Sequence, residues 1–201
     1  MRAEPGARER RLGYALGMLS VGAGAAPDLD AWLPDAAVRT HHRRSVAATA
    51  ADLWRVAQEI RLADTRALGR LVRWRIPGTA AAQTYGQLFR SYPFTILDEG
   101  EHFLVSGLCG RIWTLERDYP RLSGAREFTA WDQPGTVRVV FAHWVLGRGA
   151  GMAELCSEAR VQPIDRTAGL RLKALWAVIG RFEPLVASEP LSQAARRVRR
   201  S

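Results

Sequence analysis

The pattern of hydrophobic and polar positions predicts two kinds of element in the first half of the chain. Residues 38–46 read as a strand with hydrophobic ends. Residues 49–60 carry apolar side chains at helical spacing, with Thr49 as the expected N-cap. A basic amphipathic segment follows and ends at Pro77–Gly78, and residues 79–92 fit neither pattern.

From Phe94 onward the hydrophobic positions recur with period two, which is typical of β-strands. The glycine-rich residues 147–151 lie between two such runs, with no helix directly after them, so they do not match a phosphate-binding loop. The alternation predicts a hairpin over 94–113 that turns at Asp98–Gly100, a loop or short turn over 116–127, and strands over 136–146 and 153–161 joined by the glycine turn.

Beyond these strands the spacing becomes helical again. Asp165 or Thr167 caps a long predicted helix over 166–186, and the tail of the chain can continue it. Gly180 and Pro184 should bend or interrupt this helix, because both residues weaken a helix interior. The order of elements predicts an α+β fold class, in which a C-terminal helix packs across an antiparallel sheet.

The net charge of +9 is distributed unevenly. Residues 1–11 hold four arginines and two glutamates and residues 196–200 hold four arginines, so six of the nine net charges lie at the two ends. The chain between them is close to neutral and has no nucleic-acid-binding motif, so no specific nucleic-acid partner is expected. The first predicted strand carries Arg39, Arg43 and Arg44. Charged side chains of this kind protect an edge strand from pairing with another chain.

The cysteines and histidines do not form a metal-binding pattern. Two cysteines cannot build a disulfide framework, and Cys109 and Cys156 lie on predicted strands that are not neighbours. His41 and His42 lie on opposite faces of one strand, so they cannot bind one metal ion together. We therefore expect no metal and no cofactor, and free thiols fit the reducing environment of the cytoplasm.

Residues 12–26 contain no charged side chain, and these fifteen residues are fewer than the about 20 that a membrane-spanning helix needs. Three interpretations stay open. In the first, residues 8–26 form a helix that is docked or touches a membrane. In the second, residues 1–25 are a signal peptide that directs export. In the third, the segment is a disordered leader. With the proline-containing linker, residues 1–35 are predicted to precede a single domain over 36–201.

Five spaced segments carry a resemblance to a known family: LGRLVRWRIPG at 68–78, GLCGRIW at 107–113, Pro134–Gly135, SEARV at 157–161 and LWAVIG at 175–180. Together they resemble the START-like or SRPBCC superfamily, in particular a bacterial branch of unassigned function, over roughly residues 36–200. The resemblance implies the helix-grip fold, a curved antiparallel sheet wrapped around a long C-terminal helix. It also implies an apolar cavity between them that holds lipids, polyketides or similar molecules.

Strand alternation identifies the residues expected to line such a cavity. Arg138 marks one face of its strand as outward, so His143 on the other face is predicted to point inward. Glu158 and Arg160 are expected to face solvent and to form a charge ladder with the first strand. The predicted ligand-binding residues are Phe103, Val105, Trp113, Val139, Phe141, His143, Leu155, Trp176 and Ile179.

His143 is the main polar candidate, because a histidine can anchor a ligand by a hydrogen bond or act as a general base. A satisfied core histidine is the simpler alternative. No catalytic residue is assigned, and His143 and His42 are the candidates if the cavity supports a reaction. The sequence therefore favours binding or carriage of a small hydrophobic ligand. A polyketide cyclase or aromatase-like enzyme and a peripheral membrane-associated module are the alternatives.

Overall fold

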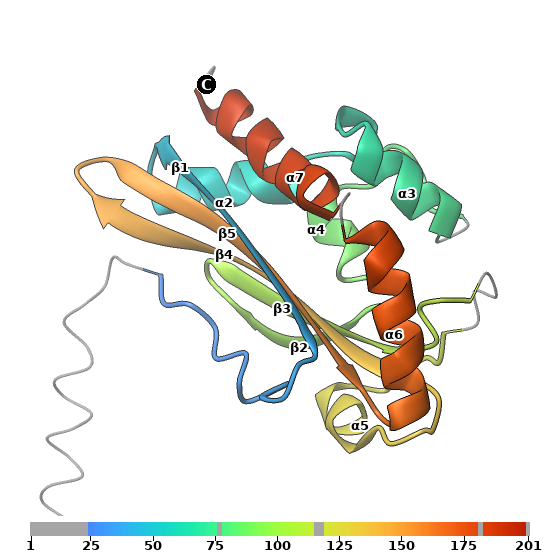
Figure 1. Cartoon of the computed structure of the whole chain (residues 1–201). Helices are drawn as coiled ribbons and strands as arrows, with labels where there is room; N and C mark the ends of the chain where they lie inside the picture. Colours follow the sequence, from blue (N-terminus) through green and yellow to red (C-terminus); the bar gives the residue numbers. More distant parts are fainter. Residues whose placement is uncertain (1–23, 76–77, 115–118, 181–182, 200–201) are drawn as a thin grey trace, which may run out of the picture.

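A computed structural model describes residues 24–75, 78–114, 119–180 and 183–199. Five antiparallel strands form one twisted, curved sheet in the order β1-β5-β4-β3-β2, and most of the helices lie on one side of it (Figure 1). In chain order the elements are β1 (Val38–Ala47), α2 (Ala50–Glu59), the 3-10 helix η2 (Leu62–Asp64), α3 (Ala67–Arg75), α4 (Tyr85–Leu88), β2 (Thr95–Gly100), β3 (Phe103–Gly110), α5 (Ala125–Ala130), β4 (Val137–Gly149), β5 (Met152–Pro163), α6 (Arg166–Ile179) and α7 (Glu183–Val198). The predicted α+β class is confirmed, and β1 pairs with β5 as expected.

Helices α2 and α7 cover one face of the sheet, which we call the helix side (Figure 1). Helix α2 begins after Thr49, whose Oγ1 accepts a hydrogen bond from the Asp52 N–H at 3.1 Å. Its apolar face buries Leu53, and the same core cluster includes Val145 of β4 and Leu191 of α7. Removing a leucine side chain from water in this way contributes about 2 kcal/mol to stability. The predicted helix and its N-cap are confirmed.

The predicted long C-terminal helix is divided in two. Helix α6 begins after Asp165, whose Oδ1 accepts a hydrogen bond from the Ala168 N–H at 2.7 Å, and it ends at Gly180. Helix α7 then begins at Glu183. The expected interruption at Gly180 is confirmed, and α7 is the helix that packs against α2 and β1. Helix α6 packs on β5 and leaves Leu170 and Val178 exposed.

The predicted turn at Asp98–Gly100 is wrong by a few residues. Strand β2 continues through Gly100 and turns at Glu101–His102, because a bulge near Leu97 shifts the register and pairing with β3 resumes after it. The glycine at position 100 is required by side-chain packing and not by a turn. A Cβ atom at Gly100 would lie 2.2 Å from the ring of Phe103, which packs over this backbone.

Three further segments differ from the sequence pattern. Strand β4 continues through most of the predicted glycine turn and reverses at Ala150–Gly151, where Ala150 has a φ of 48°. Helix α4 lies in the segment that fitted neither pattern, and α5 begins at the end of the predicted loop and continues three residues past it. Both helices are six residues long or shorter, so they are too short to show a helical period in the sequence.

The opposite face of the sheet, which we call the outer side, is also covered. Residues 24–36 cross this face, with Leu29 and Leu33 buried in the same cluster as Trp144 of β4. Helix α5 adds Phe128, which is completely buried. The expectation that this face is open to solvent is therefore wrong, because its apolar side chains are covered by chain that precedes β1.

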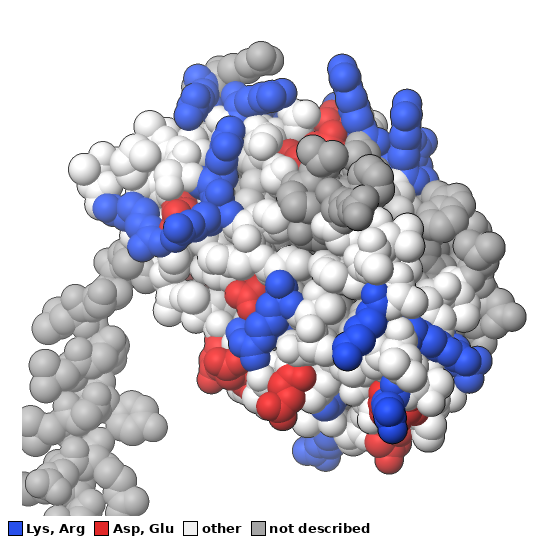
Figure 2. Space-filling model, viewed as in Figure 1, with Lys and Arg blue, Asp and Glu red and all other residues white. Residues whose placement is uncertain are grey.

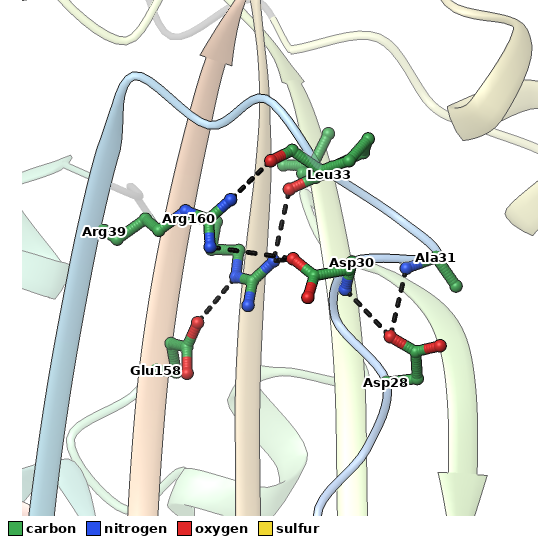
Figure 3. A network of polar contacts seen from close by, with 8 residues as sticks. Asp28, Asp30, Ala31, Leu33, Arg39, Glu158 and Arg160 are labelled. Carbon is green, nitrogen blue, oxygen red and sulfur yellow. Dashed lines mark hydrogen bonds and ion pairs between the residues drawn. The ribbon is translucent and has the colours of Figure 1, made fainter.

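Arg160 lies in the middle of a network of polar contacts on the outer side (Figure 3). It stands directly opposite Arg39 on the neighbouring strand, and the carboxylate of Asp30 from the crossing segment contacts both guanidinium groups. The Asp30 Oδ1 atom is 2.6 Å from Nη1 of Arg160 and 3.6 Å from Nη1 of Arg39. Arg160 also donates hydrogen bonds to Glu158 at 2.6 Å and to the Leu33 carbonyl at 3.2 Å. The expected charge ladder with β1 is thus replaced by a bridge through Asp30.

The hydrogen bond from Arg160 and the charges of Arg160 and Arg39 hold the pKa of Asp30 below its ordinary value. The side chain of Arg160 is only 9% exposed, so an unpaired charge there would be costly. Asp30 therefore joins the segment before β1 to the sheet through one shared carboxylate.

The interpretations of residues 1–23 lie outside the described residues. Across the ranges that the structure describes, no helix combines the length and the apolar character required to cross a bilayer. The division of the chain at residues 35 and 36 stays a prediction.

We predict that Asp30→Asn lowers the free energy of unfolding, because it removes the one carboxylate that contacts both Arg39 and Arg160, which stand opposite each other. In the Asp30→Asn variant, adding Arg39→Gln should restore part of the lost free energy of unfolding. In the wild type, Arg39→Gln should leave the free energy of unfolding unchanged or lower it. Urea denaturation of the four proteins measures this coupling. An equal effect of Arg39→Gln in both backgrounds would contradict the bridge.

Candidate functional site

A cluster of aromatic rings lies on the helix side of the sheet around His143. The ring of Phe89 has its centroid 4.5 Å from that of His143, 5.5 Å from that of Phe141 and 4.9 Å from that of Phe94. Tyr85 completes the cluster, with its ring 4.8 Å from the imidazole. These rings bring two titratable groups, His143 and Tyr85, together in the apolar interior.

Helix α4 and the turn after it position two of these rings. Its N-cap Thr84 and Gln87 form a reciprocal capping box, in which each side chain accepts a hydrogen bond from the backbone N–H of the other. The Tyr85 N–H donates to the carbonyl of Ile60 at 2.7 Å, which ties α4 to the end of α2. From the sheet, the Ser106 hydroxyl donates to the Phe89 carbonyl at 2.7 Å.

His143 is buried, and within the part of the chain that the structure describes its ring nitrogens have one hydrogen-bond partner. The side chain is 4% exposed, and its Nδ1 atom lies 3.4 Å from the hydroxyl of Tyr85. Its Nε2 atom has no hydrogen-bond partner among the described residues. Loss of water lowers the pKa of His143 from its ordinary value of 6.5 to about 3, so the imidazole is neutral at physiological pH.

Tyr85 and Ser157 extend this contact into a short polar chain. Burial raises the pKa of the Tyr85 phenol, while a hydrogen bond from Ser157 acts in the opposite direction. Ser157 lies directly opposite His143 on the neighbouring strand, which brings both side chains to the same face of the sheet. The three groups are thus enclosed in an apolar surrounding, where an unsatisfied polar atom is costly.

A cavity of about 10 Å³ adjoins His143. It lies between the sheet, α2, α4 and α7, and its lining includes Trp54, Ile60, Tyr85, Leu155 and Pro190. This volume is enough for about one water molecule. Three other buried polar atoms also have no partner among the described residues, on Trp113, Arg138 and Trp144, but none of these side chains lines the cavity.

The structure brings together four of the residues predicted to bind a ligand. Val139, Phe141 and His143 alternate along the helix-side face of β4, and Leu155 of β5 lies on the same face. The alternation on these two strands is therefore confirmed. Whether these residues bind a ligand stays a prediction.

Phe103 and Val105 lie on the other face of the sheet. Val105 is opposite Ala142 on β4 and packs with Leu33 and Trp144 on the outer side, with Phe103 against the same cluster. The expectation that these two side chains face the cavity is wrong, because Leu104, between them, is the residue of β3 that reaches the helix-side core. Both faces of β3 are apolar, so its alternation does not distinguish them.

The remaining predicted residues lie away from His143. Trp113 packs against the core between the sheet and α6, with the guanidinium carbon of Arg171 5.9 Å from its ring centroid. Trp176 is half-buried on α6 near Gly180, and the side chain of Ile179 lies outside the described residues. His42 is half-buried on the helix-side face of β1 and does not line the cavity. His41 stacks on Trp144 on the outer side, so the two histidines do lie on opposite faces.

Sequence reasoning missed Tyr85 and Phe89. They follow Thr84, a good N-cap, and are separated by four residues, which is the spacing of neighbours on one helix face. That local signal was present in residues 79–92. Their contact with His143 depends on how α4 packs, which no local pattern determines.

No protein-family model matches the chain, and no curated protein matches it either. Among solved structures, the chain is similar to a hypothetical protein from Helicobacter pylori, with a TM-score of 0.42 and 7% identity over 87% of this chain and 96% of that one. It is also similar to the Zhui aromatase/cyclase from Streptomyces sp. R1128, with a TM-score of 0.34 and 19% identity over 80% of this chain and 95% of that one. Both TM-scores are below 0.5, so neither similarity bears on function. The resemblance to the START-like superfamily stays a prediction.

We predict that His143 makes the protein sensitive to acid. Between the ordinary histidine pKa of 6.5 and the lowered value of about 3, the unfolded chain binds a proton that the folded protein excludes. The free energy of unfolding should therefore fall with decreasing pH in this window, by up to about 1.4 kcal/mol per pH unit from this one group. His143→Leu should remove that component of the slope.

Urea denaturation at pH 7, 6 and 5 measures the difference in slope between wild type and variant. His102→Asn, at the β2–β3 turn, is the matched control and should keep the wild-type slope. Parallel pH dependences for wild type and His143→Leu would show that His143 is not held neutral by burial.

Proposed function

We propose that this protein binds a small apolar molecule on the helix side of its sheet, and that the molecule carries one oxygen that accepts a hydrogen bond from His143. The observation that carries this proposal is the buried Nε2 atom of His143, which adjoins a cavity and has no partner among the described residues. The remaining lining is mainly apolar, which suits a lipid-like or polyketide-like molecule with few polar groups.

The polar chain around His143 supports a donor at Nε2. We infer that the Tyr85 hydroxyl donates its hydrogen to Nδ1, which lies 3.4 Å away and acts as the acceptor. A neutral imidazole carries a hydrogen on only one of its two ring nitrogens. Because Nδ1 is the acceptor, this hydrogen is on Nε2. A buried donor of this kind favours a ligand with a carbonyl or similar oxygen over a pure hydrocarbon.

Binding requires the cavity to become larger, and α7 supplies a place where that can occur. Pro190 lies inside α7 and also lines the cavity. Proline has no N–H, so one backbone hydrogen bond of the helix is absent beside the site, and the helix bends there more readily. A guest larger than water would enter by displacing this part of α7 from the aromatic cluster.

The lowered pKa of His143 favours binding over proton transfer. A general base works best when its pKa is close to the operating pH, and a pKa of about 3 is far below it. The imidazole suits a fixed hydrogen-bond donor better than a base that removes a proton. A cyclase-like reaction would need another group to take that role.

We predict that a ketone binds more tightly than a hydrocarbon of the same shape. Calorimetric titration with 2-acetylnaphthalene and 2-isopropenylnaphthalene tests this, because the two probes differ mainly in the carbonyl oxygen. One hydrogen bond to a buried donor should give the ketone about fivefold higher affinity. His143→Leu should remove this preference while leaving binding of the hydrocarbon largely unchanged.

His102→Asn is the control and should keep the preference. Equal affinities of the wild type for both probes would contradict the hydrogen-bonding role of His143. Absence of binding of either probe, with one ordered water at Nε2 in a crystal structure, would contradict the proposed function as a whole.

A further inference from the structure

One end of the sheet combines protruding strands with a high density of arginine. The β4–β5 hairpin extends beyond β3, since Phe103 at the start of β3 pairs with Trp144 and β4 continues to Gly149. Strand β1 follows it to the tip, where Ala47 pairs with Met152. The C-terminal part of α7 lies at this end, and Val46, Ala153 and Ala195 share one core cluster (Figure 1).

We call this region the basic end and define it by Arg43, Arg44, Arg148, Arg196, Arg197 and Arg199. Figure 2 shows Lys and Arg side chains gathered over the ends of β1 and α7 and over the β4–β5 turn, with few acidic side chains among them. Two of the arginines are paired: Arg148 with Glu154, and Arg197 with Asp64 at 3.5 Å. Arg44, Arg196 and Arg199 form no salt bridge with a described carboxylate.

The surface of the basic end suits a shallow contact with a bilayer. The tip of the hairpin consists of the small residues Gly149, Ala150 and Gly151, followed by Met152, which is 38% exposed. Between α7 and the end of α2 lies a surface groove of about 310 Å³, lined by Ile60, Asp64, Gln193, Arg196 and Arg197. The Asp64 carboxylate is paired with Arg197 at 3.5 Å, so the guanidinium group of Arg196 is the one in the wall that can meet a phosphate or carboxylate headgroup.

The position of Gly24 favours a bilayer over a nucleic acid as the partner. A Cβ atom at Gly24 would lie 2.4 Å from the Val145 carbonyl oxygen, so this backbone is in contact with the base of the protruding hairpin. Gly24 itself therefore lies at the basic end. In the sequence it is directly preceded by the uncharged residues 12–23, which include Leu16, Met18 and Leu19. An apolar segment and a basic surface are the two components of peripheral membrane binding.

We propose that the basic end is a docking surface for an anionic lipid bilayer. Arginines near such a surface gain from its negative potential, and each contributes about fivefold to the partition constant at moderate ionic strength. This proposal concerns the outside of the molecule and does not depend on the interior site around His143.

Co-sedimentation of the full chain with vesicles tests the proposal. Vesicles of phosphatidylcholine with about one third phosphatidylserine should bind the protein more strongly than vesicles of phosphatidylcholine alone, and added salt should weaken the binding. The triple variant Arg44→Gln, Arg196→Gln, Arg199→Gln should lower the partition constant by up to about a hundredfold. The matched control is Arg111→Gln, Arg126→Gln, Arg166→Gln, which removes equal charge from exposed positions outside the basic end.

The control variant should bind anionic vesicles nearly as well as wild type. An equal loss in both triple variants would show that only total charge matters and would overturn the proposal. Absence of wild-type binding to anionic vesicles would overturn it as well. A further arm uses duplex DNA: if the Arg44, Arg196, Arg199 variant loses DNA binding but keeps vesicle binding, the surface serves nucleic acid instead.

Discussion

Strand β4 has buried side chains on both of its faces, and the other layers of the molecule are arranged to cover one face or the other. On the helix side, Val145 and His143 lie under α2, α4 and α7. On the outer side, Ala142 and Trp144 lie under the segment that precedes β1. A sheet with two apolar faces is stable only when both are removed from water. The carboxylate of Asp30, shared by Arg39 and Arg160, and the hydrogen bond from Arg160 to the Leu33 carbonyl join that segment to the sheet edge.

This two-sided covering determines where function can reside. The outer side is closed by Leu29, Leu33 and Phe128, and Arg160 contacts Asp30, Glu158 and the Leu33 carbonyl there. The helix side is different, because the unpartnered ring nitrogen of His143 adjoins a cavity there, whereas the unpartnered Trp144 nitrogen of the outer side does not line that cavity. A buried polar atom that the protein does not satisfy itself is a natural point for a ligand or a water molecule.

The sequence predicted the structure correctly where a local pattern of residues agrees with the environment that those residues have in the fold. The α+β class, the N-cap Thr49, the interruption at Gly180 and the inward face of β4 follow from spacing and turn chemistry. It was misleading where both faces of a strand are apolar, as for Phe103 and Val105, and where charged residues suggested a solvent-exposed face that Leu33 in fact covers. The contact between Tyr85 and His143 joins residues 58 positions apart, and it is determined by packing and not by any local rule.

The proposed ligand contact requires His143 to be a neutral imidazole with its hydrogen on Nε2 and with Nδ1 accepting a hydrogen bond from Tyr85. Nitrogen-15 NMR of the histidine-labelled full chain tests this directly, because the shifts of the two ring nitrogens distinguish both tautomers from the charged form. We predict one histidine that stays neutral from pH 8 to pH 5 with a protonated Nε2, and that loses the Nδ1 hydrogen-bond shift in Tyr85→Phe. A hydrogen on Nδ1, or titration of this histidine near its ordinary pKa of 6.5, would contradict the account.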